Sequence, residues 1–175
     1  LPAAARDRFM MEIPVDVPES RDDRMALAFE TRFHDTDTLV GEVPEGLLPY
    51  DGLNAVAAGI QEEVHASDAL RRYVFALCEA PRAPAGAGLE VEGADPSRLV
   101  RGGVSPRGMQ ALVRATRAAA WAAGRDVVLP EDVRSVFAPV MAHRVFLTPA
   151  AEPRRERLLP ALISAAFDKI PVPAS

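Results

Sequence analysis

The sequence predicts a mainly α-helical protein, a helical bundle preceded by one short strand. Six segments place apolar residues at the i, i+3, i+4, i+7 spacing of a helix with one buried face, whereas apolar runs that suit a strand are few and brief. The 175 residues, 49% apolar and 26% charged, are enough for one ordinary domain or a large piece of one. Short connections in the second half favour antiparallel neighbours within this bundle.

The first elements expected are a strand and a helix. Phe9 to Val15 is an apolar run bounded by Pro14, which predicts a strand whose pairing partners the chain does not visibly supply. A helix is expected from about Glu19 to Arg32, because Ser20 can cap it and apolar residues follow at helical spacing. His34 to Leu48 is polar and contains glycine and proline, so we expect an irregular connector.

Two helices and a long loop are expected next. The first helix begins near Pro49 and carries an apolar stripe that comprises Leu53, Val56, Ala57, Ile60 and Val64. Ser67 predicts the cap of the second helix, whose apolar face includes Cys78 as a small buried side chain. Residues 80–102 are rich in proline and glycine and exceed an ordinary bundle turn of about 2 to 8 residues, so we expect a loop.

The second half predicts three further helices and a short strand. Ser105 is a preferred N-cap and Pro106 is favoured at a first helical position, so a helix is expected from there to Gly124. Two more helices follow, at about 130–141 and 152–169, with the short strand at Val145 to Leu147 between them.

Composition excludes several function classes. The 20 basic and 25 acidic residues give a net charge of −5 without a long basic run, so we expect no nucleic-acid partner. Cys78 is the only cysteine, which excludes an intrachain disulfide, and the three histidines are too scattered for a metal site. No apolar run reaches the roughly 20 residues of a membrane span, so we expect a cytoplasmic protein. The start at Leu1-Pro2, without methionine or a signal pattern, predicts a piece of a longer protein.

Two arginines are candidates for chemistry. Arg107 lies in the first turn of a predicted helix, where a cation opposes the helix dipole at a cost of up to about 1 kcal/mol unless an anion binds there. Backbone N–H donors and a guanidinium converging on one point suit a phosphate oxygen. The alternative is that Arg107 bends into solvent or pairs with a nearby acid. For Arg8, beside the predicted strand, the local sequence allows either a function or a solvated edge.

Three parts of the chain form a pattern when taken together. They are Leu1-Pro-Ala-Ala-Ala-Arg-Asp-Arg-Phe9, then Gly103-Val-Ser-Pro-Arg107, and then Gly124-Arg-Asp-Val-Val-Leu-Pro-Glu-Asp-Val133 with His143-Arg144-Val145. They resemble, in the same order, segments of the MoxR family of AAA+ ATPases: Leu-Pro-Glu-Ala-Gln-Leu-Asp-Arg-Phe, the Gly-Ala-Ser-Pro-Arg second sensor, and the Gly-Arg-Asp-Tyr-Val-Thr-Pro-Glu-Asp and His-Arg signatures. The resemblance runs, with gaps, through essentially the whole chain.

The resemblance implies a division of the chain. Residues 1–18 would be the C-terminal end of an α/β nucleotide-binding core, which supplies the short strand, and residues 19–175 would be a helical lid that contains the loop 80–102. Leu129 stands where the family has a threonine cap, a loss of about 1 kcal/mol of capping. The family's phosphate loop, metal-binding acidic strand end and first sensor would precede Leu1, so this chain alone is not expected to hydrolyse ATP.

The resemblance also assigns site residues. Arg8 would be the arginine finger, a catalytic residue that reaches the γ-phosphate bound in the adjacent subunit. Arg107 would be the second sensor, which binds the nucleotide of its own subunit with Ser105 and Pro106 beside it. Both roles stabilise charge on a transferring phosphoryl group. Arg6 stands where the family has leucine and is a second candidate for the finger.

For the whole protein, the resemblance implies a homo-oligomeric ring, a hexamer, that uses ATP with magnesium. It would act as a chaperone in the maturation or activation of partner proteins, often proteins with a von Willebrand factor A domain. Two other hypotheses stay open. One is a helical protein-interaction module that never binds nucleotide, and the other is the lid of a magnesium-chelatase-like motor from a neighbouring branch of the same superfamily.

Overall fold

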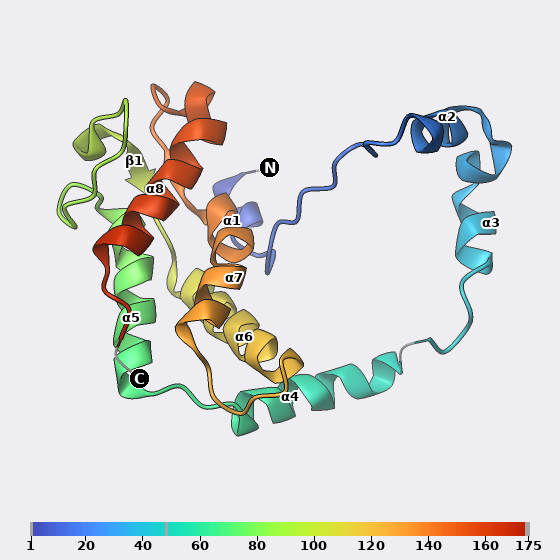
Figure 1. Cartoon of the computed structure of the whole chain (residues 1–175), viewed down its shortest axis with the longest axis horizontal. Coiled ribbons are helices and arrows are strands. Elements are labelled where there is room, and N and C mark those ends of the chain that lie inside the picture. Colours follow the sequence, from blue (N-terminus) through green and yellow to red (C-terminus); the bar gives the residue numbers. More distant parts are fainter. Residues whose placement is uncertain (1, 48, 174–175) are drawn as a thin grey trace. The chain divides into compact units, whose positions relative to one another are not determined.

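The computed structural model describes residues 2–47 and 49–173 (Figure 1). This part of the chain forms eight α-helices and two short strands, so the predicted mainly α-helical class is confirmed. The helices are α1 (Ala3–Arg6), α2 (Arg21–Phe29), α3 (Thr36–Gly41), α4 (Leu53–Glu63), α5 (Asp68–Glu79), α6 (Pro106–Ala122), α7 (Pro130–Met141) and α8 (Arg155–Lys169). The strands are β1 (Val100–Gly102) and β2 (Phe146–Leu147). Leu1, the first residue of the segment that resembles the family, lies outside the described residues.

The chain divides into two units that differ in burial. We call Leu1–Glu12 together with Ala57–Ser175 the packed unit, and Ile13–Val56 the exposed unit. The buried side chains of the described residues all lie in the packed unit. The packed unit also contains every residue predicted to act at a site.

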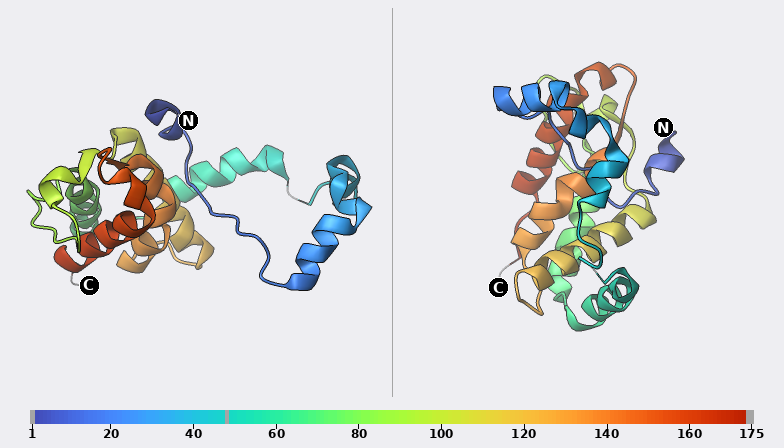
Figure 2. Two further views of the ribbon diagram at one scale, coloured as in Figure 1. Left: turned by 90° about the horizontal axis from the view of Figure 1, so that it is seen from above. Right: turned by 90° about the vertical axis from the view of Figure 1, so that its right-hand side faces the viewer.

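A hydrophobic core holds the packed unit together. Helices α5, α6, α7 and α8 gather around it (Figures 1 and 2), and α6 makes its most extensive contact with α7. The rings of Phe137 and Phe167 meet edge to face with centroids 5.1 Å apart. Completely buried apolar side chains come from all four helices, and they include Leu77, Leu112, Val133, Phe137, Val140 and Leu162.

The predicted caps fix the ends of two helices. The Ser67 hydroxyl accepts the Leu70 N–H at 3.2 Å, and α5 begins there as expected. Gly124 ends α6 with a φ of +73°, a conformation that costs little only for glycine. The Arg125 N–H then donates to the Ala120 carbonyl at 3.0 Å, which satisfies an acceptor left free at the helix end.

Asp132, in the first turn of α7, stabilises the start of this helix. Its carboxylate accepts the Leu129 N–H at 2.8 Å and pairs with both terminal nitrogens of Arg125, at 2.6 and 2.7 Å. The Arg125 hydrogen bonds hold the pKa of Asp132 below its ordinary value, although burial opposes this shift. The carboxylate of Asp132 therefore makes one half of a capping box, whereas Leu129 has no side-chain oxygen that could accept the Asp132 N–H in return.

Loop 80–102 is anchored to the core. Leu89 and Val91 are buried, and the end of the loop forms β1, a strand that the sequence analysis did not predict. β1 pairs antiparallel with β2, with Val100 opposite Leu147, which confirms the strand expected at Val145 to Leu147. The Thr148 N–H extends this pairing by donating to the Leu99 carbonyl at 3.0 Å.

Two predictions for the first half of the chain were wrong. Phe9 to Val15 forms no strand, because a strand needs a neighbour for its backbone groups and no described segment pairs with it. Its backbone N–H groups bond outside any sheet: the Phe9 N–H donates to the Arg6 carbonyl at 3.1 Å, and the Glu12 N–H donates to the Pro139 carbonyl at 2.8 Å. The expected connector from His34 to Leu48 contains α3, whose first turn is capped by Asp35, while Leu48 itself lies outside the described residues.

The exposed unit contains helices, but none of its described residues, 13–47 and 49–56, is buried. Its helix α2 begins at the predicted cap, where the Ser20 hydroxyl accepts the Asp23 N–H at 3.3 Å. Apolar side chains such as Val15, Phe29 and Val40 are each at least two-thirds exposed. Among residues 2–47 and 49–173, no helix combines the length and apolar character that crossing a membrane requires.

Candidate functional site

Arg107 lies in the first turn of α6, as predicted. Pro106 is the first helical residue, and the Ser105 hydroxyl caps the helix by accepting the Gly108 N–H at 3.1 Å. The side chain of Arg107 is exposed and makes no hydrogen bond or ion pair to another described residue. A guanidinium therefore stands in solvent at the positive end of a 17-residue helix, where it costs free energy unless an anion is present.

Arg8 and Arg6 differ in what they contact. The Arg6 guanidinium stacks over the ring of Phe146, with its central carbon 5.0 Å from the ring centroid, and its Nε is buried. Arg8 is exposed, and its side chain has no hydrogen-bond or ion-pair partner in the described part of the chain. Of the two candidates for an arginine finger, Arg8 is the more exposed, whereas Arg6 is half-buried and stacked on Phe146.

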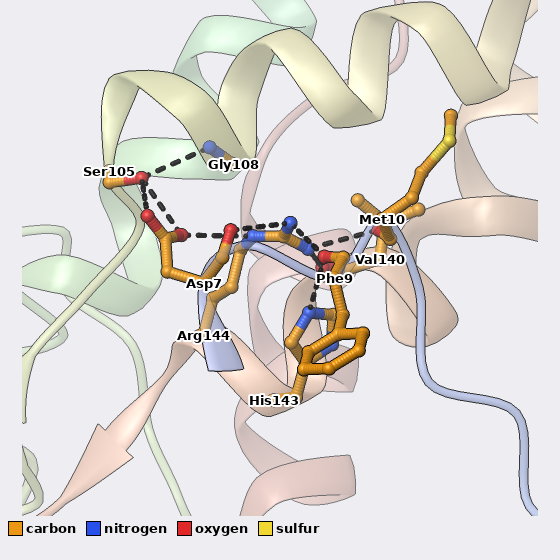
Figure 3. A network of polar contacts seen from close by, with 8 residues as sticks. All are labelled: Asp7, Phe9, Met10, Ser105, Gly108, Val140, His143 and Arg144. Atoms are coloured by element: carbon orange, nitrogen blue, oxygen red, sulfur yellow. Dashed lines mark hydrogen bonds and ion pairs between the residues drawn. The ribbon is translucent and has the colours of Figure 1, made fainter. Parts of the chain in front are cut away.

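Asp7 joins the segment that carries Arg8 to the helix that carries Arg107 (Figure 3). The Ser105 hydroxyl lies 2.9 Å from each oxygen of the Asp7 carboxylate, to which it donates. The same carboxylate accepts from the Nε of Arg144 at 3.1 Å. Ser105 therefore serves two structures at once, because it caps α6 and holds the N-terminal segment.

Arg144 is the centre of this contact, and its side chain is only 2% exposed. A guanidinium has five N–H donors, and all five meet an oxygen here. Nε donates to the Asp7 carboxylate, and the terminal nitrogens donate to the carbonyls of Asp7 at 3.2 Å, Met10 at 3.1 Å, Phe9 and Val140. Four of the five acceptors thus belong to residues 7–10, so the buried charge is fully paired.

Two glycines let the backbone approach these side chains. A Cβ added at Gly108 would lie 2.6 Å from the Cδ of Arg144, closer than real Cβ contacts. A Cβ added at Gly103 would lie 2.7 Å from the Cα of Arg82. The segment 103–108 therefore needs glycine on both sides of Val104 to Arg107 for steric reasons.

His143 supports the same segment as a neutral side chain. Its Nε2 lies 3.2 Å from the Phe9 carbonyl, which can only accept, so Nε2 carries the proton. Its Nδ1 is buried and has no partner among the described residues. Burial, and secondly the charge of Arg144, lower the pKa of His143 below its ordinary value.

The contacts among Asp7, His143 and Arg144 were not predicted from the sequence. The available signal was the resemblance itself, since Asp7 and the His143-Arg144 pair both fall within matched segments. Their pairing spans up to 137 residues along the chain and has no local pattern. Arg8, Ser105, Pro106 and Arg107 are carried by two segments that this cluster holds together.

Other reactive side chains offer no competing site. Cys78 is fully buried as predicted, and burial raises the pKa of its thiol to about 12, so it is not a nucleophile near neutral pH. Within residues 2–47 and 49–173, no three side chains of His, Cys, Asp or Glu gather in a way that could hold a metal ion. Arg8 and Arg107 are both exposed, and a guanidinium can donate to the oxygens of a phosphate group.

The chain is similar to several known proteins. An AAA lid domain family matches residues 94–162. The protein named MoxR from Paracoccus denitrificans is 70% identical over 175 residues, which cover 100% of this chain and 52% of that protein. MoxR from Methylorubrum extorquens is 49% identical over 99% of this chain and 50% of that protein. The chaperone MoxR1 of Mycobacterium tuberculosis is 31% identical over 85% of this chain and 36% of that protein.

A solved structure agrees with these relatives. The crystal structure of a putative ATPase from Cytophaga hutchinsonii matches 99% of this chain and 49% of its own, with a TM-score of 0.76 and 26% identity. The chain spans about half the length of the two MoxR proteins it matches. On these similarities, and on the motifs and fold described above, the chain belongs to the MoxR family of AAA+ ATPases.

Proposed function

We propose that this chain is the lid and second-sensor part of a MoxR-type ATPase that binds and hydrolyses ATP as a ring. Residues 1–18 would end the nucleotide-binding core and residues 19–175 would form the lid. The MoxR relatives are about twice as long as this chain, so the remaining half would supply the phosphate loop and hold the magnesium. The second candidate, an interaction module that never binds nucleotide, is favoured by none of the contacts described above.

The position of Arg107 carries this proposal. Its guanidinium is exposed in the first turn of α6, and the Ser105 cap fixes the turn from which it projects. Such an arginine can donate two parallel hydrogen bonds to a phosphate group of the nucleotide in its own subunit. It would stabilise the negative charge that spreads over the transferring phosphoryl group.

Arg8 would act on the nucleotide of the adjacent subunit. Arg6, the other candidate, is engaged by Phe146, whereas the Arg8 guanidinium is exposed to solvent. An arginine supplied from a neighbouring subunit contributes the same kind of charge stabilisation and makes hydrolysis depend on ring assembly. The two arginines would therefore serve two different nucleotide sites.

The ring would be a hexamer that acts as a chaperone. The name of the Mycobacterium tuberculosis relative, chaperone MoxR1, supports this role in outline. We propose that closure of the lid on nucleotide, through Arg107, moves α6 and the helices packed on it, and that this motion acts on a partner protein. A protein with a von Willebrand factor A domain is the partner class that we propose.

Steady-state hydrolysis by the complete ATPase tests both arginines. Arg107→Ala should lower turnover at saturating ATP by about 10- to 1,000-fold, the range for loss of one group that stabilises transition-state charge. Arg114→Ala is the matched control, because Arg114 is an exposed arginine on the same helix. Arg8→Ala should cause a comparable loss, whereas Arg6→Ala should retain most of the turnover.

The opposite pattern would refute the assignments. Full turnover in Arg107→Ala would remove the sensor role, and a larger loss in Arg6→Ala than in Arg8→Ala would transfer the finger to Arg6. Turnover that is unaffected by all three substitutions would remove both arginine roles, and absence of ATP hydrolysis by the unsubstituted complete protein would favour the nucleotide-independent module.

A further inference from the structure

The backbone on both sides of Arg8 is held by one buried side chain. Arg144 donates to the Asp7 carbonyl and to the Phe9 carbonyl, the two residues that flank Arg8 (Figure 3). The Arg8 N–H also donates to the Ala5 carbonyl at 3.1 Å. The backbone at Arg8 is therefore fixed, while its side chain stays exposed.

The same side chain ties this backbone to the start of α6. Arg144 pairs with the Asp7 carboxylate, which accepts from Ser105, and Ser105 caps the turn that carries Arg107. These contacts include a charged pair and a side chain whose donors are all hydrogen-bonded. Because the contacts are largely shielded from water, we expect them to hold the two segments rigidly. Arg8 and Arg107 thus lie on two segments that one cluster of contacts joins.

Helix α6 can approach Arg144 this closely only because residue 108 is a glycine. At Gly108 an added Cβ would lie 2.6 Å from Cδ and 3.0 Å from Nε of Arg144. A methyl group there must displace the guanidinium without deleting any donor or acceptor. At Gly59 on α4, by contrast, an added Cβ meets only the Glu63 carboxylate oxygen at 4.0 Å, which is ordinary contact.

We infer that Arg144 is a positioning residue for Arg8, which it holds against the start of α6 so that the finger and the sensor are presented by one rigid cluster. This inference rests on the proposed function, because it assigns Arg144 to hydrolysis in the adjacent subunit. A displacement of about 1 Å in a catalytic group can lower a rate by about 100-fold, so a fixed backbone at Arg8 has kinetic value. Arg144 itself is buried and does not reach the nucleotide.

Mixed rings of the complete ATPase test this inference. Arg144→Lys keeps the charge but offers three donors instead of five and loses the planar fork, and Gly108→Ala displaces the guanidinium from the side of α6. Each variant ring should hydrolyse ATP about 10- to 100-fold more slowly at saturating ATP. Gly59→Ala is the matched glycine control and should keep wild-type turnover.

The decisive readout is regain of activity on mixing. Each variant is combined with subunits that cannot bind ATP because their phosphate loop is disabled but that keep wild-type Arg8 and Arg144. An Arg144→Lys subunit still binds ATP and now receives a well-placed finger from its neighbour, so turnover should rise well above that of either parent ring. A general weakening of the lid would not be repaired by the neighbour.

Arg8→Ala, mixed in the same way, separates the inference from the proposed function. Regain with Arg8→Ala but not with Arg144→Lys or Gly108→Ala would overturn the positioning role alone, and so would wild-type turnover in both variant rings. No regain with Arg8→Ala would overturn the finger itself. Failure of both variants to form rings, while Gly59→Ala forms them, would show that Arg144 supports the fold and would also overturn the positioning role.

Discussion

The packed unit and the exposed unit use the same local helix signals, but their side chains differ in burial. Both contain amphipathic helices with polar caps, such as α5 with Ser67 and α2 with Ser20. In the packed unit the apolar faces meet one another, and side chains such as Leu77 and Leu112 are completely buried. In residues 13–47 and 49–56 no side chain is buried, although valine, leucine and phenylalanine are frequent there.

This difference shows that amphipathic helices alone do not make a core. Burial of apolar area is the main stabilising term, and it needs a second apolar face at the right distance. In the packed unit, where that second face exists, single substitutions should strongly lower the unfolding free energy. In the exposed unit, equivalent substitutions should change it little.

The largest contrast is expected between two phenylalanines. Phe137 is fully buried against Phe167, so Phe137→Ala should lower the unfolding free energy by about 3 to 5 kcal/mol. Phe29 is 73% exposed, so Phe29→Ala should change it by less than about 0.5 kcal/mol. Urea unfolding of the chain, followed by circular dichroism, measures both. Equal losses would mean that the exposed unit shares the core.

A smaller contrast is expected between two aspartates. Asp7→Asn removes the negative charge that neutralises buried Arg144 and should cost about 1 to 3 kcal/mol. Asp35→Asn in the exposed unit keeps a good cap for α3 and should leave the unfolding transition within about 0.5 kcal/mol. The same urea titration compares them. If Asp7→Asn lowered the unfolding free energy by less than Asp35→Asn does, the buried charge of Arg144 would not need the Asp7 carboxylate to neutralise it.

Two glycines with nearly the same backbone conformation should also differ. Gly124 has a φ of +73° at the end of α6, and Gly46 has a φ of +72° in the exposed unit. Gly124→Ala should lower the unfolding free energy of the packed unit by about 1 to 2 kcal/mol, the cost of this conformation for alanine. Gly46→Ala should leave that transition unchanged, because the strain lies outside the cooperative core. A matching loss from Gly46→Ala would contradict the division into two units.

The smallest effect expected is a pH dependence from His143. Since its pKa is lowered in the folded chain, the unfolded chain binds a proton that the folded chain excludes. Stability should therefore be constant above about pH 6.5, the ordinary histidine value, and fall as the pH drops toward the lower folded pKa. His143→Gln should remove this slope, and urea unfolding at several pH values between about 7.5 and 5 measures it. The same slope in both proteins would assign the effect to other groups.

The helices of the packed unit could be predicted because their signals are local. Ser67, Ser105 and Gly124 mark helix ends by their own chemistry, and the apolar spacing between them gives the buried face. The predicted strand at Phe9 to Val15 was wrong because strand formation depends on a partner, which a local apolar run does not supply. Helix α3 was missed because its six residues are too few for an apolar period.

In the candidate site, the exposed arginines could be predicted, but the long-range contacts that hold their segments could not. Arg107 could be found from its place at a helix start, and Arg8 from the resemblance of its segment to a known family. The contact between Asp7 and Arg144 joins residues 137 apart, and no local pattern distinguishes Arg144 from the 18 other arginines of the chain. Only the folded structure shows that this arginine is buried and holds the backbone of Arg8.

The central claim is that the two exposed arginines serve different nucleotide sites, Arg107 its own and Arg8 the neighbouring one. The most direct test is turnover in mixed rings, in which Arg107→Ala or Arg8→Ala subunits are combined with subunits that cannot bind ATP. Arg8→Ala rings should regain activity because the neighbour supplies the missing finger, and Arg107→Ala rings should stay inactive because the defect lies in the subunit that holds the ATP. Regain with Arg107→Ala, or none with Arg8→Ala, would contradict the account.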